Sequence, residues 1–278
     1  MLSEVLAFLE PARGGPVWDL TLGGAGHLRA FLTAAPAGTA AIGFDGDPIA
    51  RERAADLPTR VEVGDLLHLR ALSASWPRPR AVLCDFGLSS LQVDDPARGF
   101  SYRLDGPLDM RMNPTDGPTA SEWLQDVSQR ELESILRDYG EERYAGRIAR
   151  VIKESLPLDT TTALADAVVR AVGSHRDRTH HPARRTFQAV RIAVNQEYER
   201  IEMALRVAME ALLPGGRLVV LSYHSGEDRI AKVLFREAGH AGQVQLLTKR
   251  PLEPSDAECE TNPRARSAKL RAVERVAD

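Results

Sequence analysis

A glycine-rich turn near the N-terminus is the feature that most limits how this chain can fold. Segment 17–27 reads VWDLTLGGAGH, a short apolar run followed by Gly23, Gly24 and Gly26. Because glycine has no side chain, such a turn lets the backbone approach a ligand closely. A second apolar run ends at Asp45, nineteen residues after Gly26. An acid at that distance, on the next strand of a βαβ unit, can bind both hydroxyls of a ribose. The pattern predicts a site for a cofactor that contains a nucleoside.

Two further residues bear on the choice of cofactor. Leu28 stands where a dinucleotide-binding turn needs a third small residue, and the Asp19 carboxylate would repel a pyrophosphate. The same carboxylate can bind an α-ammonium group. S-adenosylmethionine (SAM) has a ribose and an amino-acid end but no phosphate, so we favour SAM over NAD. A tight strand-to-helix turn without a ligand is the structural alternative.

The composition is that of one large domain or of a core domain with an insertion. The chain has 278 residues, of which 43% are hydrophobic and 27% are charged. It contains no apolar run near the ~18 residues of a membrane span and no signal-peptide pattern. Cys84 and Cys259 are too few for a disulfide framework, and the adjacent His180 and His181 cannot bind one ion from a regular element. We expect a reduced, cytoplasmic protein without a metal site.

Charge is unevenly distributed along the chain. The net charge of −3 argues against a general nucleic-acid binder. However, segments 176–191 and 264–275 each carry five basic residues against one acid. Two such basic stretches indicate a confined phosphate-binding surface, with two solvated faces as the alternative.

Strands and helices alternate in the first third of the chain. We expect strands near 17–21, 40–45, 60–64 and 80–85, with helices at about 26–34, 48–56 and 66–74, which is the doubly wound α/β pattern. From about 91 to 185 the sequence shows only helices, two of which begin with the capping boxes 119–122 and 128–131 and a third at Thr160 or Thr161.

The α/β pattern then resumes. A long helix at 187–213 precedes a strand at 217–223 and a helix after Glu227, and two short strands follow near 244–248 and 269–275. We therefore assign residues 1–91 and 186–278 to an α/β core and residues 92–185 to a helical insertion, which is a candidate substrate-recognition domain.

The candidate site residues follow the strands, because open α/β sheets bind ligands at the carboxyl ends of their strands. Asp85 ends the fourth strand, and Ser89, Ser90 and Gln92 come soon after it. His224 lies in the polar loop after the fifth strand, where we expect a functional histidine. Asp109 lies in the segment PLDMRM at 107–112, which is either part of a site or a loop packed by its methionines. Ser222, His224 and Asp228 could be combined into a catalytic triad, but the sequence has no nucleophile elbow to support one.

These segments closely resemble the small-subunit ribosomal RNA methyltransferase H family, also called MraW. The matches run in the family's order over almost the whole chain. They are 19–27 (DLTLGGAGH), 43–48 (GFDGDP), 85–94 (DFGLSSLQVD), 98–100 (RGF), 107–112 (PLDMRM), 139–143 (YGEER), 181–191 (HPARRTFQAVR), 222–229 (SYHSGEDR) and 262–269 (NPRARSAK).

The resemblance implies a fold, a reaction and a set of contacts. The fold is a Rossmann-like SAM-dependent methyltransferase with an all-helical insertion domain. The reaction is methylation of N4 of one cytidine in the decoding region of 16S rRNA, with the small ribosomal subunit as partner. Whether the chain forms a homodimer is left open. The residues implied or predicted to bind SAM are Asp19, Gly23, Ala25, Gly26, His27, Asp45, Leu66, Asp85 and Gln92.

The chain departs from the family at three places. The family's His-x-Pro-Val segment precedes the first residue here, which is consistent with a shorter start or a lost edge of the site. Ala25 replaces a glycine, and we expect its φ to tolerate a β-carbon. Gly226 replaces a leucine, and we expect the loop there to gain freedom.

The N4 amine of cytosine is a poor nucleophile, because its lone pair is delocalised into the ring. A hydrogen-bond acceptor for the N4 protons would localise that lone pair and stabilise the positive charge that develops on nitrogen. We assign this role to Asp85, with Asp109 and His224 as competitors and Ser89 as a further alternative. The base must leave its stack to reach such a site. For Phe187 we expect core packing rather than base stacking. The candidates for phosphate binding are Arg184, Arg185, Arg191, Arg264, Arg266 and Lys269.

Other functions remain open from the residues alone. One is methylation of DNA or protein, although the tetrad DFGL at 85–88 differs from the Pro-Pro-containing motif of DNA amino-methyltransferases. Another is a non-catalytic ribosome-assembly factor that binds SAM and RNA. An NAD oxidoreductase is the most distant alternative.

Overall fold

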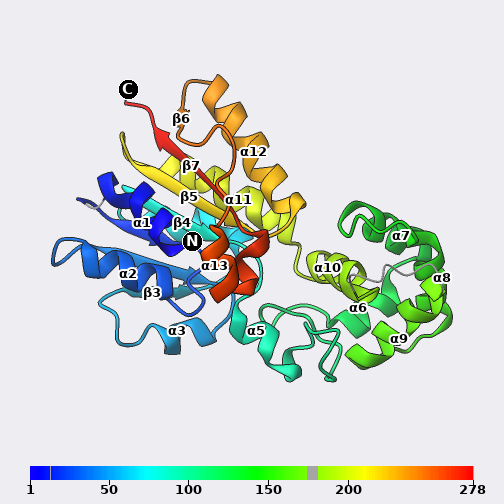
Figure 1. Cartoon of the computed structure of the whole chain (residues 1–278). Helices are drawn as coiled ribbons and strands as arrows, with labels where there is room; N and C mark the ends of the chain where they lie inside the picture. The colour runs from blue at the N-terminus through cyan, green and yellow to red at the C-terminus, as the bar shows by residue number, and fades with distance from the viewer. Residues whose placement is uncertain (13, 174–180, 278) are drawn as a thin grey trace. The chain divides into compact units, whose positions relative to one another are not determined.

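The computed structural model describes residues 1–12, 14–173 and 181–277 and divides the chain into two units (Figure 1). Met1–Gly87 and Tyr198–Asp278 form the first, which we call the sheet unit. Leu88–Glu197 form the second, which we call the helical unit. Arg176, Arg178 and His180, which contributed to the sequence predictions, lie outside the described residues.

The sheet unit is built on seven strands in the order β3-β2-β1-β4-β5-β7-β6. The pairs β3–β2, β2–β1, β1–β4 and β4–β5 are parallel, whereas β7 runs antiparallel to both β5 and β6. The five parallel strands follow the Rossmann order 3-2-1-4-5, and the antiparallel β7 lies between β5 and β6. The strands are β1 (Val17–Asp19), β2 (Ala41–Asp45), β3 (Arg60–Val63), β4 (Ala81–Asp85), β5 (Arg217–Ser222), β6 (Val244–Leu246) and β7 (Lys269–Arg275).

The parallel strands are buried on both faces, which explains their nearly continuous apolar sequences. Successive side chains alternate between two clusters: Val82 and Cys84 of β4 belong to one, and Ala81 and Leu83 to the other. Helices α11 and α12 contribute to the first cluster, whereas α1 and α2 contribute to the second (Figure 1). The helices of this unit are α1 (Leu2–Leu9), η1 (Glu10–Ala12), α2 (Gly26–Ala34), α3 (Ile49–Arg53), η2 (Leu66–His68), α4 (Leu69–Leu72), η3 (Ser73–Ser75), α11 (Glu197–Ala211), α12 (Ser225–His240), α13 (Asp256–Thr261) and η6 (Pro263–Ser267).

The helical unit has its own apolar core, which includes Leu124, Leu136, Ile148 and Val168. Two predicted helix starts are confirmed: the side chains of Thr119 and Ser128 accept hydrogen bonds from the backbone N–H groups three residues later. Within its described residues, β pairing is limited to the bridge between Pro107 and Thr160. The helices are α5 (Ser90–Asp94), η4 (Pro96–Arg98), α6 (Ala120–Asp126), α7 (Gln129–Asp138), α8 (Ala145–Glu154), α9 (Thr161–Val172) and α10 (Ala183–Val194).

The prediction of one long helix at 187–213 is wrong. Two helices, α10 and α11, are separated by Asn195 and Gln196, and Gln196 has a φ of +46°. The buried Asn195 amide donates to the carbonyls of Met110 and Arg191, and its oxygen accepts from the N–H of Met112. The bonds to Met110 and Met112 tie the Asn195 side chain to a segment more than 80 positions away in the sequence, and the helix is interrupted at this point. The expected helix at 66–74 is also three short pieces, η2, α4 and η3.

The cysteines and the lengths of the helices bear on the expectations from composition. Cys84 is buried in β4, as predicted, and neither it nor Cys259 is in a disulfide. Among the described residues, none of the helices has the length and apolar character needed to cross a bilayer.

Candidate functional site

Three carboxylates gather at one edge of the sheet, because each is the last residue of a parallel strand. Asp19 ends β1, Asp45 ends β2 and Asp85 ends β4. The register aligns these strands side by side, so the carboxyl ends meet as the alternating pattern predicted. The structure therefore brings together three residues that lie up to 66 positions apart in the sequence.

Asp19 is the most deeply buried of the three, with 1% of its surface exposed. Its Oδ1 accepts a hydrogen bond of 3.1 Å from the N–H of Thr21. Burial raises the pKa of Asp19 from 3.8 to about 7, and the neighbouring carboxylates of Asp85 and Asp45 contribute to the increase. A positive group placed beside Asp19 would lower that pKa and would be bound by the carboxylate in return.

Asp45 is tied directly to the glycine turn. Its Oδ2 accepts a hydrogen bond of 2.7 Å from the N–H of Gly23, and its Oδ1 accepts one of 2.8 Å from the N–H of Asp47. Gly23 has a φ of +48°, a conformation that glycine adopts at little cost. Burial raises the pKa of Asp45, although these hydrogen bonds oppose the shift. The turn and the acid thus form one structural unit.

Asp85 is held from three sides. Its N–H donates to Thr21 Oγ1 at 2.5 Å, and its Oδ1 accepts from the Tyr223 hydroxyl at 2.9 Å. The Nδ1 atom of His27, at the start of α2, lies 3.5 Å from its Oδ2. Burial raises the pKa of Asp85, whereas His27 and Tyr223 act in the opposite direction. These contacts fix the orientation of the carboxylate. They also keep its pKa lower than burial alone would make it.

A fourth carboxylate, Glu227, lies fully buried in the first turn of α12. Its Oε2 accepts from the N–H groups of Tyr223 and His224, at 2.6 and 3.3 Å. It thereby fixes the loop that carries the Tyr223 hydroxyl to Asp85. Burial and the Asp85 carboxylate raise the pKa of Tyr223, which keeps the phenol protonated.

His224 has the geometry of a helix cap. Its Nδ1 accepts a hydrogen bond of 3.2 Å from the N–H of Gly226, and its Nε2 lies 3.2 Å from Glu227 Oε1. From the sequence alone we expected His224 to be the functional residue of this loop and gave no role to Tyr223 or Glu227. Both residues lie in the polar segment directly after β5, so their position in the sequence already marked them as candidates. Their link to Asp85 could not be predicted, because it depends on the pairing of β4 with β5.

The expectation for Ala25 is wrong. It has φ +59° and ψ 18°, in the left-handed region that glycine prefers, and it is the N-cap of α2. Its methyl group is fully buried in the core cluster that includes Leu22 and Leu28. An alanine in this conformation costs roughly 1 kcal/mol, which burial of the methyl group offsets in part. By contrast, a β-carbon at Gly24 would meet nothing within 4 Å.

The expectation for Gly226 is also wrong. A β-carbon at Gly226 would lie 1.9 Å from the hydroxyl oxygen and 2.6 Å from Cζ of Tyr198. The ring of Tyr198 thus occupies the space in which the family's leucine would lie. The residue is buried in the first turn of α12, so the glycine makes room for a neighbour and does not loosen a loop.

Asp65 and Leu66, which follow β3 at the start of η2, have different environments. Asp65 forms a bidentate ion pair with Arg200, with both N–O distances at 2.9 Å. Burial would raise the pKa of Asp65, but the hydrogen bonds from Arg200 and from the Leu67 N–H lower it overall. Leu66 is half-buried and packs against the core cluster that contains Trp76. Its predicted contact with an adenine stays a prediction.

Gln92, a predicted SAM contact, and Asp109, a candidate catalytic acid, belong to the helical unit. Gln92 and Ser89 form a capping box at the start of α5, in which Ser89 Oγ accepts from the Gln92 N–H and Gln92 Oε1 accepts from the Ser89 N–H. Asp109 forms a bidentate ion pair with Arg111 at 2.9 and 2.7 Å. Burial would raise the pKa of Asp109, but the bonds from Arg111 lower it.

The basic candidates for phosphate binding divide into two groups. Arg184, Arg185, Arg264 and Arg266 are exposed, and Lys269 is half-exposed. Arg191, in contrast, pairs with Glu197 through two bonds of 2.7 and 2.9 Å. Phe187 is buried in the core of the helical unit, in agreement with the role expected from the sequence.

The basic residues of segment 264–275 also differ in whether they are paired with an acid. Arg271, one of the cations counted in it, forms a buried bidentate ion pair with Asp228. It links β7 to the first turn of α12 and is not available to a phosphate in this conformation.

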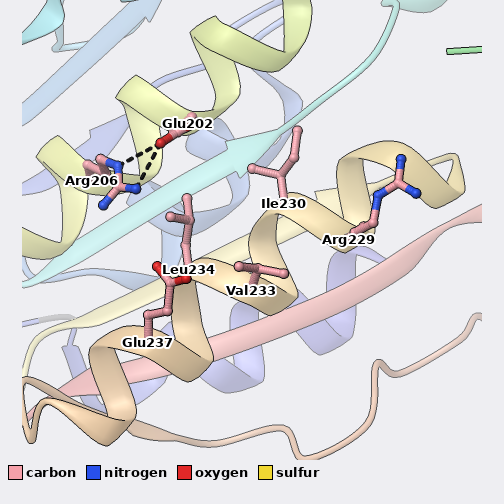
Figure 2. A pocket seen from close by; sticks show the side chains of 7 residues that line it. All are labelled: Glu202, Arg206, Arg229, Ile230, Val233, Leu234 and Glu237. Carbon is pink, nitrogen blue, oxygen red and sulfur yellow. Dashed lines mark hydrogen bonds and ion pairs between the residues drawn. The ribbon is translucent and has the colours of Figure 1, made fainter. Parts of the chain in front are cut away.

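A separate pocket of about 220 Å³ lies between α11 and α12 (Figure 2). Ile230, Val233 and Leu234 form its apolar part, and Glu202 and Arg206 form an ion pair across one turn of α11 at its side. Arg229 and Glu237 complete the lining. The carboxylates at the sheet edge do not contribute to it, so this pocket is distinct from the candidate site.

Several solved structures match this chain at low sequence identity and with TM-scores below 0.5. An rRNA methylase from Streptococcus thermophilus is 11% identical, with a TM-score of 0.43 over 99% of this chain and 94% of that one. The N-methyltransferase NodS from Bradyrhizobium japonicum, in complex with S-adenosyl-L-homocysteine, is 8% identical, with a TM-score of 0.45 over 99% of this chain and 85% of that one.

Sequence relatives are much closer. A ribosomal RNA small subunit methyltransferase H from Acidobacterium capsulatum is 45% identical over 99% of this chain and 97% of the relative. The protein of the same name from Thermomicrobium roseum is 45% identical over 100% of this chain and 93% of the relative. The model of the MraW methylase family matches residues 1–276. The predicted family is therefore confirmed: this chain belongs to the MraW methylase family.

Proposed function

We propose that this protein is a SAM-dependent rRNA methyltransferase that methylates N4 of one cytidine in the decoding region of 16S rRNA. The observation that carries the proposal is family membership over residues 1–276, supported by full-length relatives named as ribosomal RNA small subunit methyltransferase H. The cytidine and its N4 atom come from the resemblance of the sequence motifs to that family.

The chemistry of the sheet edge fits SAM. The Asp45 carboxylate, fixed by the Gly23 N–H, suits the ribose hydroxyls, and the buried Asp19 carboxylate suits a cationic amino-acid end. The space beside Gly24 is open to a ligand. Three carboxylates in one place favour a ligand with positive charge and disfavour a pyrophosphate, which argues against NAD. When bound, SAM supplies a methyl group on a positively charged sulfur.

In this proposal Asp85 acts on the substrate amine. Its carboxylate accepts a hydrogen bond from the N4 amine, which localises the nitrogen lone pair toward the methyl group. As the C–N bond forms and the C–S bond breaks, positive charge develops on N4, and Asp85 stabilises it and accepts the proton. The Tyr223 hydroxyl and His27 keep the carboxylate oriented for this step.

The test is transfer of labelled methyl from SAM to small ribosomal subunits that lack the modification, followed by nucleoside analysis. We expect N4-methylated cytidine at a single site in the decoding region. Binding of SAM and of subunits without any transfer would instead favour a non-catalytic assembly factor. Transfer to a different nucleoside would retain the methyltransferase and reject the N4-cytidine assignment.

A further inference from the structure

An aromatic stack on the helical unit is not used by the chemistry described above. The ring of Tyr102 stacks on the His181 imidazole with centroids 4.9 Å apart and an interplanar angle of 20°. The Arg103 guanidinium carbon lies 5.7 Å from the centre of the Tyr102 ring. Phe187 forms an edge contact with Tyr102, with ring centroids 5.8 Å apart. Phe187 is buried, whereas Tyr102 and His181 are half-exposed and Arg103 is exposed.

The loop that carries Tyr102 and Arg103 is held in place by hydrogen bonds. Ser101 Oγ accepts from the N–H groups of Arg103 and Leu104, both at 3.2 Å. The Thr161 hydroxyl donates to the Leu104 carbonyl at 2.8 Å and accepts from the Gly106 N–H at 3.1 Å. A β-carbon at Gly106 would lie 2.0 Å from the Pro96 carbonyl oxygen, so the loop is also closely packed there. A binding surface on such a loop loses little entropy when it meets a ligand.

The charges around the stack suit an RNA strand. Burial and the nearby Arg103 lower the pKa of His181, so its ring is neutral at physiological pH and acts as a stacking surface. Arg103 is exposed, and so is Arg184, in the first turn of α10 just after His181. The charge of the exposed Asp166 acts on His181, and another exposed acid, Asp105, lies two residues after Arg103.

We infer that Tyr102, His181 and Arg103 form a stacking platform for an unpaired base of the RNA substrate. Aromatic rings and guanidinium planes stack on the faces of nucleobases, and those faces are accessible only in unpaired RNA. Arg184 would then contact a neighbouring phosphate. The inference rests on the proposed RNA substrate, but it concerns binding and not methyl transfer.

The test compares binding of the full-length protein to two fluorescent oligoribonucleotides, one containing an unpaired loop and one fully paired, by anisotropy at fixed salt. Tyr102→Leu keeps an apolar side chain on Phe187 but removes the ring, and we expect it to weaken loop binding by tenfold or more. Arg103→Gln should weaken it about threefold, and Tyr102→Phe should bind as the wild type does. Duplex binding should change by less than twofold.

Matched controls separate stacking from general damage. Tyr144→Leu replaces another half-buried tyrosine of the same unit, and Arg130→Gln removes another exposed arginine; both should bind the loop normally. Equal binding by Tyr102→Leu and the wild type, or equal loss in Tyr144→Leu, would overturn the platform. If Tyr102→Leu is unfolded by circular dichroism, Arg103→Gln and Tyr102→Phe still decide the question. Methyl transfer by the wild type is measured separately, so its absence would reject the proposed function without altering the binding result.

Discussion

The acids at the ends of β1, β2 and β4 and the acid Asp109 of the helical unit have opposite electrostatic environments. In the sheet unit, burial raises the pKa of Asp19, Asp45 and Asp85, and these acids lie beside one another. In the helical unit, Arg111 lowers the pKa of Asp109 through a bidentate ion pair. From the sequence alone, Asp85 and Asp109 were both candidates for the residue that accepts the N4 proton. Asp85 is desolvated, which is more typical of an acid in a functional site, whereas Asp109 is paired with Arg111, which is more typical of a structural acid.

The largest expected effect comes from replacing these two competitors. Asp85→Asn should lower kcat for methyl transfer by 100- to 1000-fold at saturating SAM, because an amide cannot accept the N4 proton. Asp109→Asn should change kcat by less than tenfold and lower the melting temperature, because it weakens the pair with Arg111. Single-turnover methylation measures both. A large kcat loss in Asp109→Asn with an intact fold would move the acceptor to the helical unit.

His224 is tested in the same assay. His224→Asn keeps a side-chain oxygen that can cap α12, so we expect kcat within tenfold of the wild type. A loss as large as that of Asp85→Asn would show that the imidazole itself takes part in the reaction.

The second prediction concerns the pH dependence of stability that the buried Asp19 causes. The folded-state pKa of Asp19 lies above its unfolded value, so folding favours the protonated acid and stability is lost as pH rises toward about 7. Between pH 5 and 8 the ligand-free wild type should lose about 3 kcal/mol of unfolding free energy through this group. Asp19→Asn should remove that loss, while Asp45 and Asp85 leave a residual slope. Urea unfolding at pH 5, 6.5 and 8 measures it, and parallel curves for both proteins would contradict the assignment.

The third effect concerns packing behind the sheet edge. Gly226→Leu should destabilise the protein by about 2 kcal/mol, because Tyr198 occupies the space for the new side chain. Tyr198→Ala in the same protein should relieve most of the cost, which a double-mutant cycle measures as coupling. Gly14→Ala is the control, since its β-carbon would meet nothing within 4 Å. Additive effects of the Gly226 and Tyr198 substitutions would rule out the steric explanation.

The smallest effect tests how Asp85 is held. Tyr223→Phe removes the hydrogen bond that lowers the pKa of Asp85, so the acidic limb of the pH–rate profile should move to higher pH and kcat should fall about tenfold. Tyr198→Phe, a second tyrosine of the sheet unit, should leave the profile unchanged. A lower melting temperature with an unchanged profile would give Tyr223 a structural role only.

The sequence alone determined the features that depend on local pattern. Apolar runs gave the five parallel strands, β1 to β5, and the glycine turn and Asp45 were located to the residue. Hydroxyl and carboxylate spacing gave the starts of α6 and α7. Family motifs gave the methylase family. Each of these signals lies within a window of a few residues, or within motifs that can be compared one by one.

Tertiary structure decided the features that depend on contacts between distant residues. Asn195 ends α10 while bonded to Met110 and Met112, and Gly226 makes room for Tyr198, 28 positions before it in the chain. Arg191 and Arg271 look like free cations in the sequence but are paired with acids. Tyr223 meets Asp85 only because β4 and β5 are neighbours. Local composition cannot encode these partners, since each depends on which surfaces the fold brings into contact.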